Sequence, residues 1–187
     1  GISVGGLPDG IVDAGTLATD SVDSAELIAG SIDTAHIATD QITSAILPAG
    51  SVLQVVTATY NTETTSTSDT YIDTGLTATI TPSSSSNKVL VIVNQNGLEK
   101  DNSDIKMKCI LLRGSTELSA FIGSQTLNTS TANRTDMGGT GATYLDSPST
   151  TSATVYKTQF QNMSDAGAVA VQNSSSRSSI TLMEIAG

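Results

Sequence analysis

Four ten-residue units make up residues 10–49: GIVDAGTLAT from Gly10, DSVDSAELIA from Asp20, GSIDTAHIAT from Gly30 and DQITSAILPA from Asp40. The third residue of each unit is Val or Ile, the sixth is Gly or Ala, and the eighth is Leu or Ile. A period that persists through four units indicates a repeat architecture. Large apolar side chains therefore recur every five residues, at Val12, Leu17, Val22, Leu27, Ile32, Ile37, Ile42 and Leu47.

A five-residue spacing is incompatible with a straight strand or a regular α-helix. In a strand an odd spacing sends successive anchors to opposite faces. In an α-helix five residues advance the anchor by about 500°, so the apolar stripe would wind around the whole surface. Each half-unit must therefore contain a bend. Asp13, Asp23 and Asp33 precede small residues and fit the N-cap of a single helical turn.

One large apolar residue in five cannot form a core within a single chain. Ordering a residue costs roughly 1–2 kcal/mol, whereas burying one Leu or Ile returns only about 1.5–3 kcal/mol. Identical chains around a common axis would supply the missing contacts, and the small sixth residue would allow close approach. Two alternatives are a disordered Ser/Thr/Asp-rich linker and a self-contained pentapeptide solenoid, although four units provide few coils for such a stack.

Charge is distributed unevenly along the 187 residues. Residues 1–50 contain seven acidic residues and no Lys or Arg, and the whole chain has 18 acidic and 8 basic residues, a net charge of −10. Nucleic-acid binding is not expected, because phosphates require Lys and Arg. No apolar run approaches 18 residues, so no membrane insertion is predicted. The single cysteine, Cys109, excludes an intrachain disulfide.

The pattern changes to strands after Pro48-Ala49-Gly50. We therefore predict an irregular lead-in at residues 1–9, stalk repeats at 10–49 and an all-β head at 50–187. Short strands separated by polar turns are typical of an antiparallel β-sandwich or jelly roll. The almost wholly apolar segment Lys88–Asn94 is predicted to be buried on both faces. The other predicted strands are Ser51–Tyr60, Thr70–Thr81 (split at Gly75), Asp104–Arg113, Glu117–Ile122, Ala142–Leu145, Ala153–Phe160, Ala168–Gln172 and Ser179–Ile185.

The repeats, followed directly by AGSVLQVVTATYNTETTST, resemble fibre proteins of tailed bacteriophages, especially marine and cyanobacterial phages. The head segments carrying the resemblance are GSVLQVV at Gly50–Val56 and ITLMEIAG at Ile180–Gly187. The resemblance covers the chain from about Gly10 to its end. It implies a homotrimeric virion protein on the particle surface, with a stalk and a β-rich head. Its expected partners are other virion proteins and a host-surface glycan or protein; the alternative is a purely structural connecting or capsid-decorating fibre.

Evidence for catalysis or ion binding in the sequence is weak. The only histidine, His36, lies at a repeat position that also holds Thr, Glu and Ile, so a solvated side chain competes with a metal-binding ring in a trimer. The segment Glu99–Asp104, with Asp101 and Asp104, lacks the spacing of a calcium loop. Residue types alone leave a glycan-cleaving spike as an alternative, but acids such as Asp69, Asp73 and Asp146 are ordinary for strand ends and turns, and nothing marks a partner with a raised pKa. We predict no enzymatic activity, cofactor or resident metal.

Receptor binding, if present, is expected in loops of the head, because recognition usually resides on loops carried by a rigid scaffold. The longest polar loop is predicted at Ser124–Asp136 and a second at Gln95–Ser103. Tyr144 and Tyr156 are candidates either for stacking on a sugar ring or for core packing. The loop candidates are Asn128, Asn133, Arg134 and Lys100.

Overall fold

A computed structural model describes residues 32, 35–38, 41–43, 46–101, 105–122, 135–164 and 167–187. The chain divides into two compact units, Gly1–Ile46 and Leu47–Gly187. Among the described residues, regular structure is almost entirely β-strand, and the one helical element is the 3-10 turn η1 (Asn173–Ser175). The second unit is therefore all-β, as predicted.

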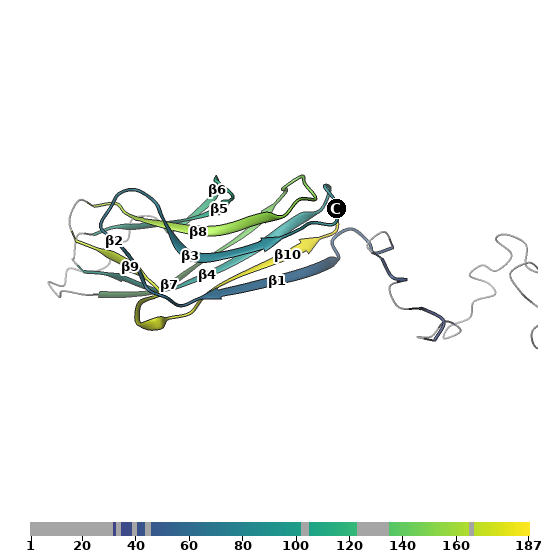
Figure 1. The fold of residues 1–187 in the computed structure, drawn as a ribbon, viewed down its shortest axis with the longest axis horizontal. Helices are drawn as coiled ribbons and strands as arrows, with labels where there is room; N and C mark the ends of the chain where they lie inside the picture. Colours follow the sequence, from purple (N-terminus) through teal and green to yellow (C-terminus); the bar gives the residue numbers. More distant parts are fainter. Residues whose placement is uncertain are drawn as a thin grey trace, which may run out of the picture. The chain divides into compact units, whose positions relative to one another are not determined.

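One antiparallel sheet, sheet A, contains six strands (Figure 1). Strand β10 lies between β1 and β4, and β4 pairs along its other edge with β7. Beyond the end of β10, two short strands continue the sheet on the same side of β4. The strands are β1 (Val52–Tyr60), β2 (Thr64–Ser66), β4 (Lys88–Lys100), β7 (Thr135–Asp146), β9 (Val169–Val171) and β10 (Ser178–Ile185).

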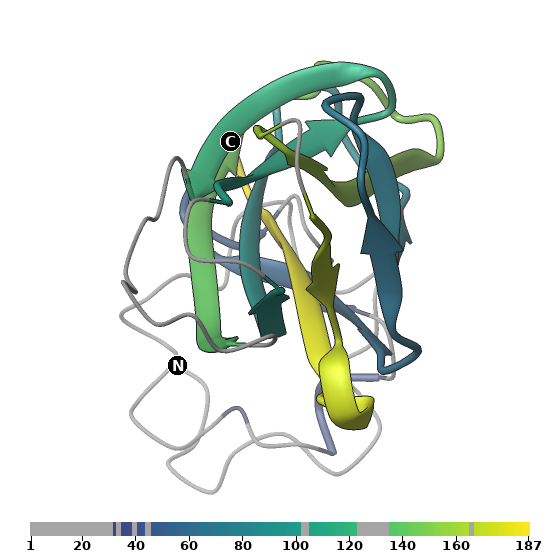
Figure 2. The same cartoon turned by 90° about the vertical axis from the view of Figure 1, so that its left-hand side faces the viewer.

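The second antiparallel sheet, sheet B, has the strand order β3-β8-β5-β6. The chain crosses repeatedly between the sheets, and both can be followed from the end in Figure 2. This sandwich-like arrangement is compatible with a jelly roll. The strands are β3 (Ile72–Ile80), β5 (Met107–Arg113), β6 (Thr116–Ile122) and β8 (Thr154–Asn162).

Alternating side chains build the core between the sheets. In β3, the buried residues Leu76, Ala78 and Ile80 alternate with exposed threonines. They share one apolar cluster with Val91 of β4 and Leu182 of β10, which belong to the opposite sheet. Each fully buried large side chain contributes about 1.5–3 kcal/mol. This cluster therefore holds the two sheets together.

A buried polar cluster also joins the sheets. The hydroxyl of Tyr156 on β8 donates a hydrogen bond to Asp146 Oδ2 on β7 at 2.6 Å. Nη1 of Arg113, on β5, lies 2.8 Å from each carboxylate oxygen of Asp146. Burial, and then the Asp146 carboxylate, raise the pKa of Tyr156. The raised pKa favours the protonated phenol, which is the form that donates this hydrogen bond.

The end of sheet A at which the repeats join the head is tied by hydrogen bonds. The Gly50 N–H donates to the Ala186 carbonyl at 2.8 Å, and the Ala186 N–H donates to the Ser51 carbonyl at 2.9 Å. Nearby, the buried Glu184 carboxylate accepts hydrogen bonds from Gln54, Ser83 and Asn87. Burial alone would raise the pKa of Glu184, but these donors hold it below its ordinary value. The chain therefore enters the head at a fixed point.

Three predicted strand features are wrong. Strand β4 runs to Lys100, so residues 95–100 are not a loop; pairing with β7 and β9 extends the strand. The segment Lys88–Asn94 is not buried on both faces, because only one face meets sheet B, and Ile92 is 37% exposed. Gly75 does not split β3: the strand passes through an irregularity there with φ +86°, and a Cβ would collide with the Tyr60 ring.

Two further strands differ from the predictions in existence or length. Strand β2 was not predicted, because three polar residues carry no periodic signal. Strand β7 begins at Thr135 rather than Ala142, and glycines at 138, 139 and 141 lie within it. Glycine is unfavourable in a strand by itself, so the long pairing with β4 sustains β7 here.

Candidate functional site

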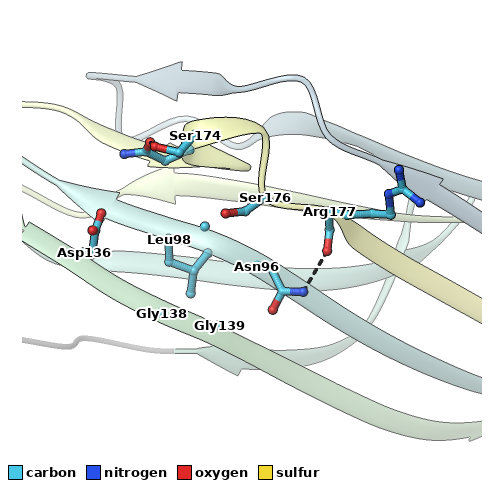
Figure 3. Close-up of a pocket in the computed structure, with 10 residues that line it drawn as sticks. Asn96, Leu98, Asp136, Gly138, Gly139, Ser174, Ser176 and Arg177 are labelled. Atoms are coloured by element: carbon cyan, nitrogen blue, oxygen red, sulfur yellow. Dashed lines mark hydrogen bonds between the residues drawn. The ribbon is translucent and has the colours of Figure 1, made fainter.

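A pocket of about 550 Å³ lies where β4 and β7 meet the turn between β9 and β10 (Figure 3). Sheet A has a local gap there, because β9 and β10 pair with different parts of β4 and the chain between them folds into η1. Its lining residues are Asn96, Gly97, Leu98, Asp136, Gly138, Gly139, Asn173, Ser174, Ser176 and Arg177.

The turn that forms one wall has strained backbone. Gln172, Ser174 and Ser175 have φ values of 55°, 53° and 59°, a left-handed conformation that non-glycine residues rarely adopt. Such residues cost of order 1–3 kcal/mol each and persist only where surrounding contacts hold them. In other proteins this strain is concentrated at binding and catalytic sites. The pocket is therefore the leading candidate site among the described residues.

Hydrogen bonds fasten this turn to β4. The Gln172 N–H donates to the Asn96 carbonyl at 3.0 Å, and Asn96 Nδ2 donates to the Arg177 carbonyl at 2.7 Å (Figure 3). The Ser178 hydroxyl oxygen accepts from the Asn96 N–H at 2.9 Å and from the side chains of Gln95 and Gln172. The shape of this wall is therefore set before any ligand arrives.

Two glycines keep the pocket open. Gly97 has φ +61°, and a Cβ there would lie 2.6 Å from the Asn173 nitrogen and 2.7 Å from the Ser176 Cβ. A Cβ at Gly139 would collide with Asn96 Oδ1. At Gly97 only glycine lets the backbone of β4 approach the backbone of the turn so closely, whereas at Gly139 the closest atom belongs to a side chain. This site was not predicted from the sequence; a glycine at position 97 and the paired glycines of β7 are typical of a close backbone approach, but they do not indicate which segments meet.

The pocket combines complementary polar groups and lacks a dominant charge. Asp136 supplies only acceptors at neutral pH, Arg177 only donors, and Asn96, Ser174 and Ser176 supply both. The Arg177 guanidinium points away from the Asp136 carboxylate (Figure 3), so the two charges do not neutralise one another directly. Such a lining suits a hydroxyl-rich ligand. Leu98, the one large apolar residue among the described lining residues, is 1% exposed and packs in the core.

Of the sequence-predicted receptor residues that the structure describes, Lys100, Tyr144 and Tyr156, none lines this pocket. Tyr156 is 0% exposed and lies in the core, and Tyr144 packs partly buried against the same cluster. Lys100 is 1% exposed at the end of β4, so its ammonium group does not project from a solvated loop as predicted. Asn128, Asn133 and Arg134 lie outside the described residues, as does most of the Ser124–Asp136 loop.

The repeat anchors are only partly described. Ile32, Ile37 and Ile42 are 51%, 40% and 55% exposed in the single chain. Leu47 is intermediate. The anchors Val12, Leu17, Val22 and Leu27 lie outside the described residues.

The ion-binding candidates are likewise only partly described. His36 is exposed, and Asp104 lies outside the described residues. The Asp101 carboxylate accepts a hydrogen bond from the Ala168 N–H at 2.6 Å. Within the described ranges, no three His, Cys, Asp or Glu side chains cluster in a way that could hold a metal ion.

No protein-family model matches the chain, and no curated protein matches it. In the part of the chain that the structure describes, no helix has the length and apolar character needed to span a membrane.

Proposed function

We propose that this chain is the subunit of a homotrimeric bacteriophage fibre on the virion surface, with a repeat stalk and a sandwich head that binds a host-surface glycan. The observation that carries the proposal is the exposure of Ile32, Ile37 and Ile42, which are 51%, 40% and 55% exposed. Large apolar side chains at a constant spacing require partners, and two further copies of the same stripe are the simplest source. The resemblance to phage fibres supports the same assembly.

The pocket beside η1 is the proposed glycan site. Its walls are preformed, its polar groups include donors and acceptors, and its mixed charge does not demand an anionic or cationic ligand. Binding there would rest mainly on hydrogen bonds from Asn96, Asp136 and the serines, since none of the described lining residues is aromatic. Three copies on one fibre would convert a weak single-site affinity into strong adsorption through avidity.

The assembly is tested by native mass spectrometry of the full chain at micromolar concentration. We expect a trimer, and we expect Ile32→Ser, Ile37→Ser and Ile42→Ser together to yield monomers. A matched control changes Thr34 and Thr39, which lie between anchors, to Ser and should remain trimeric. A monomeric unmodified chain would refute the proposal.

Glycan binding is tested separately on a glycan array with the unmodified trimer. Asn96→Ala and Asp136→Ala should each weaken glycan binding roughly tenfold or more. Each substitution removes a side chain that would form hydrogen bonds with the glycan in place of water. Ser119→Ala on sheet B, away from the pocket lining, is the control. Equal binding by all variants would remove the pocket from the proposal while leaving the trimer intact.

The aromatic-free lining favours a second candidate, a connecting or capsid-decorating fibre that attaches to other virion proteins without binding a receptor. A trimer that binds no glycan on the array and does not adsorb to the host would support this candidate. Release of sugar from host polysaccharide would instead identify a glycan-cleaving spike.

A further inference from the structure

The outer face of sheet A, the face directed away from sheet B, is unusually apolar. Its side chains come from alternate positions of β1, β10, β4 and β7. Val52, Val55 and Leu145 are 51%, 55% and 51% exposed. Together with partly buried residues from the two middle strands, the large apolar members are Val52, Val55, Leu90, Ile92, Leu145, Met183 and Ile185. Exposed apolar patches of this kind mark interaction surfaces.

Strand register aligns these residues into rows that cross the sheet. Val55 is opposite Met183, Met183 is opposite Leu90, and Leu90 is opposite Leu145, so four apolar side chains form one continuous row. The next row towards the chain entry begins with the pair Val52 and Ile185. The rows further from the entry become polar: first Thr57, Thr181, Ile92 and Thr143, then Thr59, Ser179, Asn94 and Gly141. Apolar character is thus concentrated where the repeats join the head.

The outer face of sheet B is mixed, because Ile110 and Leu112 of β5 lie opposite the polar residues Gln159 and Lys157 of β8. There, Asp73 on β3 accepts hydrogen bonds from Lys157 at 3.1 Å and from Gln159 at 2.8 Å on β8. An antiparallel sheet with one solvated face normally alternates in this manner, apolar inward and polar outward. On sheet B the outward apolar residues Ile110 and Leu112 are only 3% and 6% exposed, whereas on the outer face of sheet A three of the large apolar side chains named above stay about half exposed. A partner that covers that face accounts for the difference.

Charge indicates what kind of partner fits. The chain carries a net charge of −10, so two copies repel unless they meet through surfaces without acidic groups. These rows on the outer face of sheet A contain no Asp or Glu, because the Glu184 side chain points inward. Their single charged residue is Lys88, which lies opposite Ile185 in the row nearest the chain entry. The row from Val55 to Leu145 also lacks the polar groups that a glycan needs. A second copy of this chain satisfies these conditions.

Chain connectivity brings the copies within reach. The last repeat anchor, Leu47, precedes Val52 by five residues, which span at most about 18 Å. Three chains joined through their repeats would therefore hold their heads close together, at an effective concentration in the millimolar range. We propose that the outer face of sheet A packs against neighbouring heads around the trimer axis. This inference rests on the proposed trimeric fibre and adds a second, head-borne interface to it.

Charge substitutions in the full chain test the inference. Val55→Glu and Leu145→Glu place a carboxylate at exposed positions that the isolated fold tolerates. In the trimer each would bury an unpaired charge, so we expect the association constant to fall roughly 100-fold or more. The matched control is Val155→Glu on the outer face of sheet B, where Val155 is 39% exposed. Analytical ultracentrifugation over a range of protein concentrations measures the association constant of each of the three variants and of the unmodified chain.

The outcomes separate this inference from the trimer itself. An unmodified chain that is monomeric throughout would overturn both. An unmodified trimer whose Val55→Glu and Leu145→Glu forms assemble as tightly as Val155→Glu would overturn the head interface alone. Variants that remain trimeric but lose adsorption to the host would also overturn it and would assign the face to a host protein.

A fluorescent probe supplies an independent measurement. The only native cysteine, Cys109, is buried, so Leu145→Cys can be labelled selectively with a polarity-sensitive dye. We expect its emission to shift to shorter wavelength as the protein assembles. The same dye at Val155→Cys should show no shift. Water-like emission at position 145 in an established trimer would overturn the inference.

Discussion

Tyr156→Phe isolates the buried hydrogen bond between the two sheets. The substitution keeps the ring, which is 0% exposed, and removes only the hydroxyl that donates to Asp146 Oδ2 at 2.6 Å. A hydrogen bond to a charged group contributes about 1.5–3 kcal/mol. Arg113 remains 2.8 Å from the same carboxylate, so the charge is not left unpaired and the larger cost of an isolated buried ion does not arise.

We therefore expect Tyr156→Phe to lower the free energy of unfolding by about 1.5–3 kcal/mol. For a domain of this size, Tm should fall by roughly 4–10 °C. Urea unfolding followed by far-UV circular dichroism measures the change. All proteins must be compared at one concentration, because oligomerisation contributes to apparent stability.

Tyr144→Phe is the matched control. Tyr144 also packs against the core cluster, but its hydroxyl forms no hydrogen bond to any described residue. Its replacement should change the free energy of unfolding by less than about 0.5 kcal/mol. If Tyr156→Phe is as mild as Tyr144→Phe, the contact with Asp146 does not contribute to the association of the two sheets, and the argument for this cluster fails.

Three further predictions concern the Glu184 carboxylate, Gly97 beside the turn and the ten-residue repeat. The folded-state pKa of Glu184 lies below its ordinary value of 4.5, so the carboxylate stabilises the fold above that pH, and this stabilisation is lost as the pH falls through the folded-state pKa. The melting temperature of Glu184→Gln should therefore depend less on pH, between about pH 5 and about pH 3, than that of the unmodified chain. Parallel pH profiles for the two proteins would contradict this. Gly97→Ala should lower the free energy of unfolding by roughly 1–3 kcal/mol more than Gly114→Ala, as measured by thermal melting. The two glycines have similar φ values, but a Cβ at position 97 would meet Asn173, whereas a Cβ at position 114 would lie in open space. Equal losses of stability would exclude the collision. Deletion of Asp20–Ala29 should preserve trimer mass and melting, whereas deletion of three residues should disrupt both by moving later anchors out of phase; identical behaviour would remove structural meaning from the ten-residue period.

The all-β class and the approximate positions of most strands could be predicted from local patterns. Alternation in residues 70–81 and the apolar run at 88–94 correspond to β3 and the first half of β4. The polar run Asn173–Ser176 is typical of a turn, and η1 lies there. These features depend on neighbours in sequence, because side-chain alternation and turn chemistry are local properties.

The candidate pocket could not be predicted in this way. It combines residues 96–98 of β4, 136–139 of β7 and the turn at 173–177, which are far apart in the sequence. The sequence favoured Lys100 for a solvated loop, but pairing with β7 and β9 places it in a buried strand end. Tyr156 was compatible with either a sugar platform or the core, and only the position of Asp146 assigns it to the core.

The sequence by itself determined the ten-residue period, the acidic character of the repeats and the all-β character of the head, since these depend on composition and on the spacing of neighbouring residues. Only the tertiary structure decided which face of sheet A meets sheet B and which remains outside. Leu90 and Val91 are adjacent apolar residues with equivalent local signals, yet one lies on the exterior row and the other in the core. The physical reason is that successive side chains of a strand point to opposite faces, and contacts between distant segments decide which face is covered.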